Sequence, residues 1–116
     1  MDEIKILSGT ERLETLEATA TADREVGDVQ IINGLVCVAY ETIANGEVGR
    51  FIHQSELAVA PSGVTDADAA GKAAYWDASD SQVTTTSTDN TKCGMFLGPI
   101  TSGEEADFRL DNSINL

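Results

Sequence analysis

The pair Asn33-Gly34, set between two short apolar runs, constrains the fold of this 116-residue chain more than any other feature. Asn and Gly tolerate positive φ, which both central residues of a type I′ hairpin turn require. Polar and apolar side chains alternate over residues 28–31, before the turn, and a continuous apolar run follows it over residues 35–40. Asn45-Gly46 turns the chain a second time. Residues 27–54 are therefore predicted to form a meander of about three antiparallel strands.

The apolar run after the first turn predicts a strand that is covered on both faces. Aromatic residues make up only 5% of the chain, and its apolar residues lean towards Ala and Val, so its own core should be thin. We therefore expect a neighbouring subunit to cover one face of this strand. The candidate contacts in a homotrimer are Leu35, Val36, Val38 and Tyr40.

Further short strands are expected in the second half of the chain, around residues 72–76, 82–87, 92–100 and 106–110. Tyr75 and Trp76 should end one strand, residues 77–80 should turn the chain, and the threonines after Val83 should return it. Residues 61–71 break the pattern and predict one short helical turn, capped by Thr65 and stopped by Gly71. Short strands at this spacing indicate an all-β barrel or sandwich.

The first twelve residues have no hairpin partner in the sequence and are predicted to form an extended N-terminal arm, with residues 13–116 as a single domain. Ile4 and Ile6 alternate around Lys5, as in a strand with one buried face. We expect Ile4, Ile6 and Leu7 to add to a sheet edge in a neighbouring protein. The alternative is a disordered leader that contacts nothing.

Catalytic, cofactor-binding and metal-binding residues are not predicted. A calcium loop that starts at Asp77 would need Gly where Gln82 stands and Glu where Thr88 stands. A phosphate-binding loop that ends at Gly71-Lys72 would need Gly at position 66 and a hydroxyl at position 73. The single histidine, His53, has no nucleophile motif to serve and is expected to be a packing or surface residue.

A formal net charge of −13 argues against direct nucleic-acid binding, because a duplex must be neutralised by clustered Lys and Arg. No apolar stretch approaches the length of a membrane span, and the first residues are unlike a signal peptide. Cys37 and Cys93 lack a CxxC spacing and are expected to be free, partly buried thiols, although a disulfide between them stays open.

The chain resembles a family of small tailed-phage capsid decoration, or cement, proteins. The resemblance rests on the meander over residues 26–51, on the G-K-x-x-Y-W-D, V-T-T-T and C-G motifs within residues 69–98, and on the terminal ADFRLD over residues 106–111. Relatives often carry an automatic label as RecA/RadA-like recombinases. That label has no support here, because the nucleotide motif is absent.

The resemblance implies a small β-barrel or β-tulip fold that binds the major capsid protein as a homotrimer. It places the protein in the virion, on the outer surface of the head, after synthesis in the host cytoplasm, and implies that it locks capsomers together. The alternative from the residues is a small β-barrel binding module, such as a carbohydrate or host-factor adaptor. Exposed aromatic residues at loop tips would favour that alternative.

Overall fold

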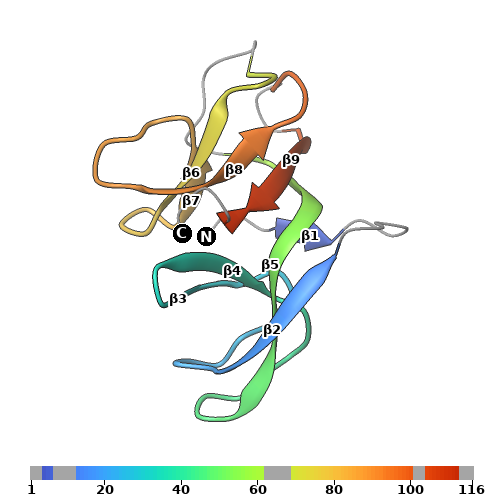
Figure 1. The fold of residues 1–116 in the computed structure, drawn as a ribbon, viewed down its shortest axis with the longest axis vertical. Coiled ribbons are helices and arrows are strands. Elements are labelled where there is room, and N and C mark those ends of the chain that lie inside the picture. The colour runs from blue at the N-terminus through green and yellow to red at the C-terminus, as the bar shows by residue number, and fades with distance from the viewer. Residues whose placement is uncertain (1–3, 7–12, 62–68, 101–103, 113–116) are drawn as a thin grey trace.

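The fold consists of antiparallel strands, as a computed structural model that describes residues 4–6, 13–61, 69–100 and 104–112 shows (Figure 1). The predicted all-β class is therefore confirmed, with the sheet curled into a half-barrel. The expected helical turn falls mostly within residues 62–68, outside the described residues. The strands are β1 (Ile4–Ile6), β2 (Glu14–Thr19), β3 (Val29–Ile32), β4 (Leu35–Ala39), β5 (Val48–Val59), β6 (Ala73–Asp77), β7 (Gln82–Thr84), β8 (Thr91–Phe96) and β9 (Ala106–Asp111).

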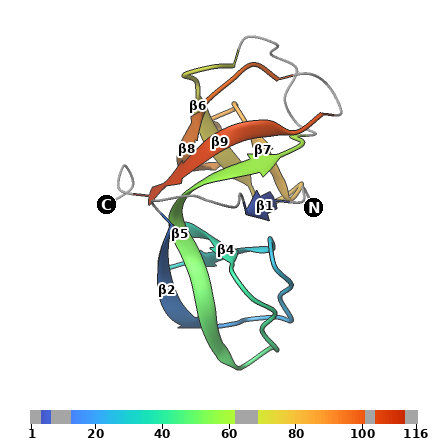
Figure 2. The same cartoon turned by 90° about the vertical axis from the view of Figure 1, so that its right-hand side faces the viewer.

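The twelve-residue strand β5 connects the two halves of the molecule, with β2–β4 in the lower half of Figure 1 and β6–β9 in the upper half. One edge of β5 pairs with β2 along residues 48–54 and with β1 along residues 57–59. The opposite edge pairs with β4 at residues 51–52 and with β9 along residues 54–59. Figure 2 shows β5 as a long curved strand that spans both halves. Four strands thus depend on β5 for backbone hydrogen bonds.

The first Asn-Gly pair forms the predicted hairpin turn between β3 and β4. Asn33 and Gly34 have φ values of 49° and 84°, as a type I′ turn requires. The second pair differs, because only Gly46 has positive φ, at 86°. Its amide donates to the carbonyl of Ala20, just after β2. The second turn therefore leads β5 into its pairing with β2 before β5 meets β4.

Strand β4 is covered on both faces by its own chain. Val36 and Val38 face the main core, whereas Cys37 and Ala39 face a separate small core. The reason for expecting a neighbouring subunit over β4 is therefore wrong. The small core comprises Ala20, Cys37, Ala39, Ile43 and Phe51. The main core comprises Ile4, Val29, Val36, Val38, Ile52, Leu57, Val59, Ala69, Ala74, Trp76, Val83, Cys93, Phe96, Ile100, Ala106, Phe108 and Leu110.

The N-terminal strand has a partner within the chain, contrary to the sequence prediction. Ile4 pairs with Val59 of β5 and is only 3% exposed. Gly27, at φ 96°, lies so close to the Ile4 carbonyl that a Cβ there would collide with it. Turn signals between neighbouring strands could not predict this pairing, because β1 and β5 are far apart in sequence. Whether the segment also contacts another protein stays a prediction, and Leu7 lies outside the described residues.

The side-chain amide of Asn112 fills the gap where β5 exchanges β4 for β9. Its Oδ1 accepts from the Val36 amide at 3.0 Å, and its Nδ2 donates to the carbonyls of Val36 at 2.8 Å and His53 at 2.9 Å. Asn112 is 3% exposed, so water does not replace these bonds. The amide acts as an extra residue of sheet and joins the end of β9 to β4.

A second buried amide, that of Gln30 on β3, holds the chain that leaves β2. The Nε2 of Gln30 donates to the Thr19 carbonyl at 3.0 Å, and its Oε1 accepts from the Thr21 amide at 3.1 Å. The Arg24 guanidinium also donates to this oxygen, at 3.0 Å. The small core is thereby closed at the side where β2 and β3 do not pair directly.

The Tyr75–Thr84 segment is the predicted hairpin. Trp76 of β6 pairs with Val83 of β7, and the Trp76 side chain is 4% exposed in the main core. Asp77 Oδ1 accepts from the amides of Ser79 at 3.0 Å and Asp80 at 3.2 Å. The carboxylate that could have started a calcium loop therefore stabilises a turn.

Replacing Trp76 by Ala should lower the free energy of unfolding by about 3–5 kcal/mol, because truncating a buried aromatic removes its burial and leaves a cavity. Urea denaturation of the purified variant measures this loss. Tyr75→Ala, one residue earlier in β6 and half-buried, is the matched control and should lose less. Equal midpoints for the parent and Trp76→Ala would show that Trp76 is not a core residue.

Replacing Asn112 by Ala should lower the free energy of unfolding by about 2–4 kcal/mol, because the buried amide and carbonyl of Val36 and the part-buried carbonyl of His53 lose their partner. Asn112→Asp keeps the acceptor for the Val36 amide but loses both donations, so it should be destabilised as well. Asn90→Ala removes one exposed bond, to the Thr86 carbonyl, and serves as the control. Thermal melts that place Asn112→Ala beside Asn90→Ala would contradict the role of the amide.

Candidate functional site

The residues that carry chemistry do not converge in the part of the chain that the structure describes. No group of three or more His, Cys, Asp or Glu side chains lies close enough there to hold a metal ion. His53 is half-buried on β5, and Asp77 is engaged in its turn. Among the described residues, the candidate functional features are therefore surface hollows and exposed side chains.

The two cysteines are free and buried, as the sequence predicted. Cys37 lies in the small core and Cys93 in the main core, so they do not meet. Burial raises the pKa of Cys37 to about 11 and the pKa of Cys93 to about 12, because a thiolate is poorly solvated there. Both thiols stay protonated near neutral pH and are poor nucleophiles.

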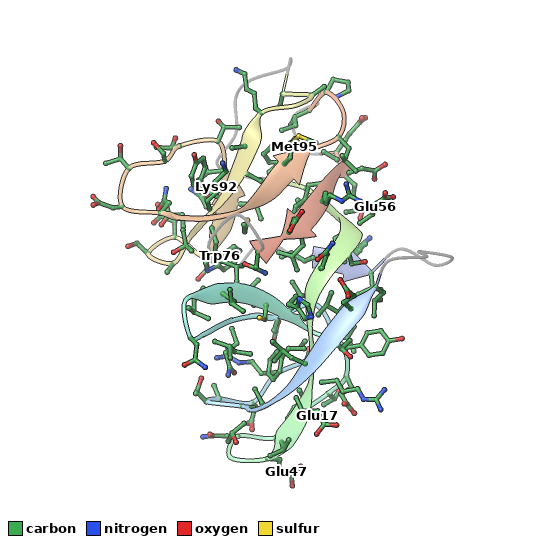
Figure 3. All side chains as sticks on the ribbon, viewed as in Figure 1. Glu17, Glu47, Glu56, Trp76, Lys92 and Met95 are labelled. Atoms are coloured by element: carbon green, nitrogen blue, oxygen red, sulfur yellow. The ribbon has the colours of Figure 1, made fainter. Side chains whose placement is uncertain are left out.

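A hollow of about 280 Å³ opens on the outer face of β6, β8 and β9, and we call it the β8 hollow. Gly94 forms part of its floor, and a Cβ at this position would collide with the Arg109 carbonyl. The absence of larger side chains leaves a mostly apolar depression beside Met95. Met95 is 39% exposed and lies on β8 in the upper half of Figure 3. The lining residues are Gly71, Ala73, Lys92, Gly94, Met95, Arg109 and Asp111.

A second hollow, of about 320 Å³, lies beside the β6–β7 hairpin and is lined by polar residues. Internal bonds order its wall: Thr86 donates its amide to Thr84 Oγ1, and Asn90 donates to the Thr86 carbonyl. No aromatic side chain lines it, so it lacks the flat apolar platform that would favour a carbohydrate site. The lining residues are Asp77, Ser79, Gln82, Thr84, Thr86, Thr88, Asp89 and Asn90.

Exposed apolar side chains gather where β5 begins. Tyr40 donates its amide to the Arg50 carbonyl, and Val48 lies two residues before Arg50 on the same face of β5. Val48 is 64% exposed and Tyr40 40%. Val26 is 53% exposed and precedes Gly27, whose amide bonds the Ala39 carbonyl. We call Val26, Tyr40 and Val48, with the adjoining Glu25, Glu41 and Glu47, the acidic tip.

The structure separates the residues for which the sequence predicted protein contacts. Val36 and Val38 are buried in the main core, and Leu35 is half-buried against the small core. Tyr40 alone of the four trimer candidates is exposed. Ile4 is buried and Ile6 is half-buried against the main core. The β8 hollow was not predicted, although a glycine inside a strand, here Gly94, signals a close backbone approach.

The described residues form one curled antiparallel sheet with two buried cores and two surface hollows, an architecture in which the surface offers contacts to a partner. No helix in the described ranges is long and apolar enough to cross a membrane. Residues 10–110 match the family of phage cement proteins, and the chain belongs to this family. It is a structural protein of the phage capsid with a cement, or decoration, role. No curated protein matches the sequence significantly.

Stability should fall as pH rises from about 9 towards 11, because of the buried thiols. Their folded-state pKa values, about 11 and 12, lie above the usual 9.0, so the unfolded chain releases these protons first. Each thiol then costs up to about 1.4 kcal/mol per pH unit in this window, and nothing below it. Urea midpoints measured between pH 8 and 11, as an approximate range around these pKa values, test this.

The double variant Cys37→Ala, Cys93→Ala is the control for the alkaline loss. It lacks both thiols and leaves every other side chain unchanged. Its midpoint should therefore fall less steeply with pH than that of the parent. Parallel slopes would rule out the thiols as the cause.

Proposed function

We propose that this cement protein binds the outer surface of the mature phage head as a homotrimer and stabilises the contacts between capsomers. The major capsid protein is the proposed partner. The family match over residues 10–110 is the observation that carries this proposal. The chemistry asked of the protein is contact alone, without a cofactor.

The fold supports such a role through its satisfied interior. Among the described residues, every buried side-chain nitrogen or oxygen has a hydrogen-bond partner. Long-range strand pairing and the bonds of Asn112 tie the two halves together. Because the two halves are joined in this way, we expect them to unfold together rather than separately.

Large apolar side chains that are exposed on the single chain support the proposed trimer. Val48, Tyr40 and Met95 are each at least 39% exposed, in a chain with a net charge of −13. Contact between copies would remove this apolar surface from water. Only Tyr40 of the residues predicted from the sequence contributes to it.

Mixing the purified protein with undecorated mature heads tests the proposed function. We expect saturable co-sedimentation, and we expect decorated heads to release DNA at a higher temperature than undecorated ones. Heads that gain no protein at saturating concentration would contradict binding. Light scattering separately tests the trimer, since a monomer both in solution and on particles would contradict that part alone.

A further inference from the structure

The β8 hollow is a positive region in a strongly acidic protein. Lys92 and Arg109 line it, and Lys72 lies between two lining residues, while Asp111 is the one acidic residue of the lining. These four side chains carry a net charge of +2, against −13 for the whole chain. Glu56 pairs with Arg109 in the sheet register but lies outside the lining, and counting it leaves the region positive.

The acidic tip has the opposite character. Its three glutamates are exposed, as are Val26, Tyr40 and Val48. Arg50 is exposed on the same face of β5 as Val48, and counting it leaves the tip with a net charge of −2. In Figure 3, Glu47 lies at the lower end of the molecule, whereas Lys92 and Met95 lie in the upper half. The two surfaces therefore lie in opposite halves of a molecule whose longest dimension is 39 Å. One copy cannot bring its own tip to its own hollow.

We infer that the β8 hollow binds the acidic tip of a second copy of this chain, with apolar side chains of the tip entering the hollow beside Met95. Contact of two tips would bring glutamates together, and contact of two hollows would bring Lys92 and Arg109 together. Contact of tip with hollow joins opposite charges and covers exposed apolar surface on both sides. The charges of the β8 hollow therefore favour an acidic partner surface, and the acidic tip of a second copy provides one.

A contact between two different surfaces is heterologous, and it generates a closed ring when the rotation between copies allows it. A trimer with cyclic symmetry needs such a contact, because identical surfaces facing each other yield only a dimer. This inference rests on the proposed trimer and adds the two surfaces that form it. It makes no use of Val36 or Val38, which are buried in the main core.

Charge reversal with rescue tests the inference. Arg109→Glu and Glu47→Lys should each weaken self-association about tenfold, as expected when like charges replace opposite ones across an interface. The double variant restores opposite charges and should regain most of the lost association. Asp80→Lys is the matched control for Glu47→Lys, because it also replaces a negative charge by a positive one. It lies at the β6–β7 turn, away from both surfaces, and should leave association unchanged. Sedimentation equilibrium at physiological ionic strength measures all four variants and the parent.

Val48→Lys provides a second variant if Arg109→Glu melts early, since Val48 is 64% exposed and its replacement needs no rearrangement of the sheet. It places a positive charge where an apolar side chain meets the positive hollow, and it should weaken association as well. Unchanged association in Val48→Lys, or no rescue in a folded double variant, overturns the inference. A parent that is monomeric at every concentration overturns it too.

Binding to heads is measured separately, so that failure of this interface is distinguishable from failure of the cement role. A parent that binds heads while the charge variants associate normally keeps the cement role and rejects the interface. If Arg109→Glu abolishes binding to heads but leaves self-association intact, the hollow contacts the shell, and the inference is wrong.

Discussion

The exchange of partners along one edge of β5 is the constraint on which the rest of the structure depends. At Phe51 and Ile52 this edge pairs with β4, and from Gln54 onwards it pairs with β9. A buried strand cannot leave a carbonyl unpaired at such a junction without a large cost. The side-chain amide of Asn112 donates to the His53 carbonyl and also bonds the amide and the carbonyl of Val36. The two halves of the molecule are therefore one unit.

Closing the fold in this way determines where function can reside. Val36 and Val38 are consumed by the main core, and Ile4 joins them there through β1. The thiols are buried and protonated, and the turn carboxylate of Asp77 bonds its own backbone. What remains for a partner is the outer surface, where apolar side chains and charges of both signs are unevenly distributed. This agrees with a cement protein, whose work is contact.

Local chemistry in the sequence predicted the parts of the fold that local chemistry controls. Asn33-Gly34 has one favourable use, a tight hairpin, and the structure contains it. Trp76 followed by turn residues and β-branched residues predicted the β6–β7 hairpin correctly. The expectation that the N-terminal segment has no partner within the chain was wrong, because β1 pairs with residues more than fifty positions away and no local signal reports such a pairing. For the same reason the second cover of β4 was assigned to a neighbouring subunit.

The sequence by itself determined the all-β class, the two sharp turns, the burial of Trp76, the acidity and the absence of a phosphate loop, since each of these depends on residue type and short spacing. The tertiary structure alone decided that β1 is internal, that Asn112 and Gln30 close the sheet where strands do not pair, and that Lys92 and Arg109 meet at one hollow. These features arise when distant strands come into register. The physical reason is that an amide or a charge has no preferred partner in the chain until the fold places one within hydrogen-bond reach.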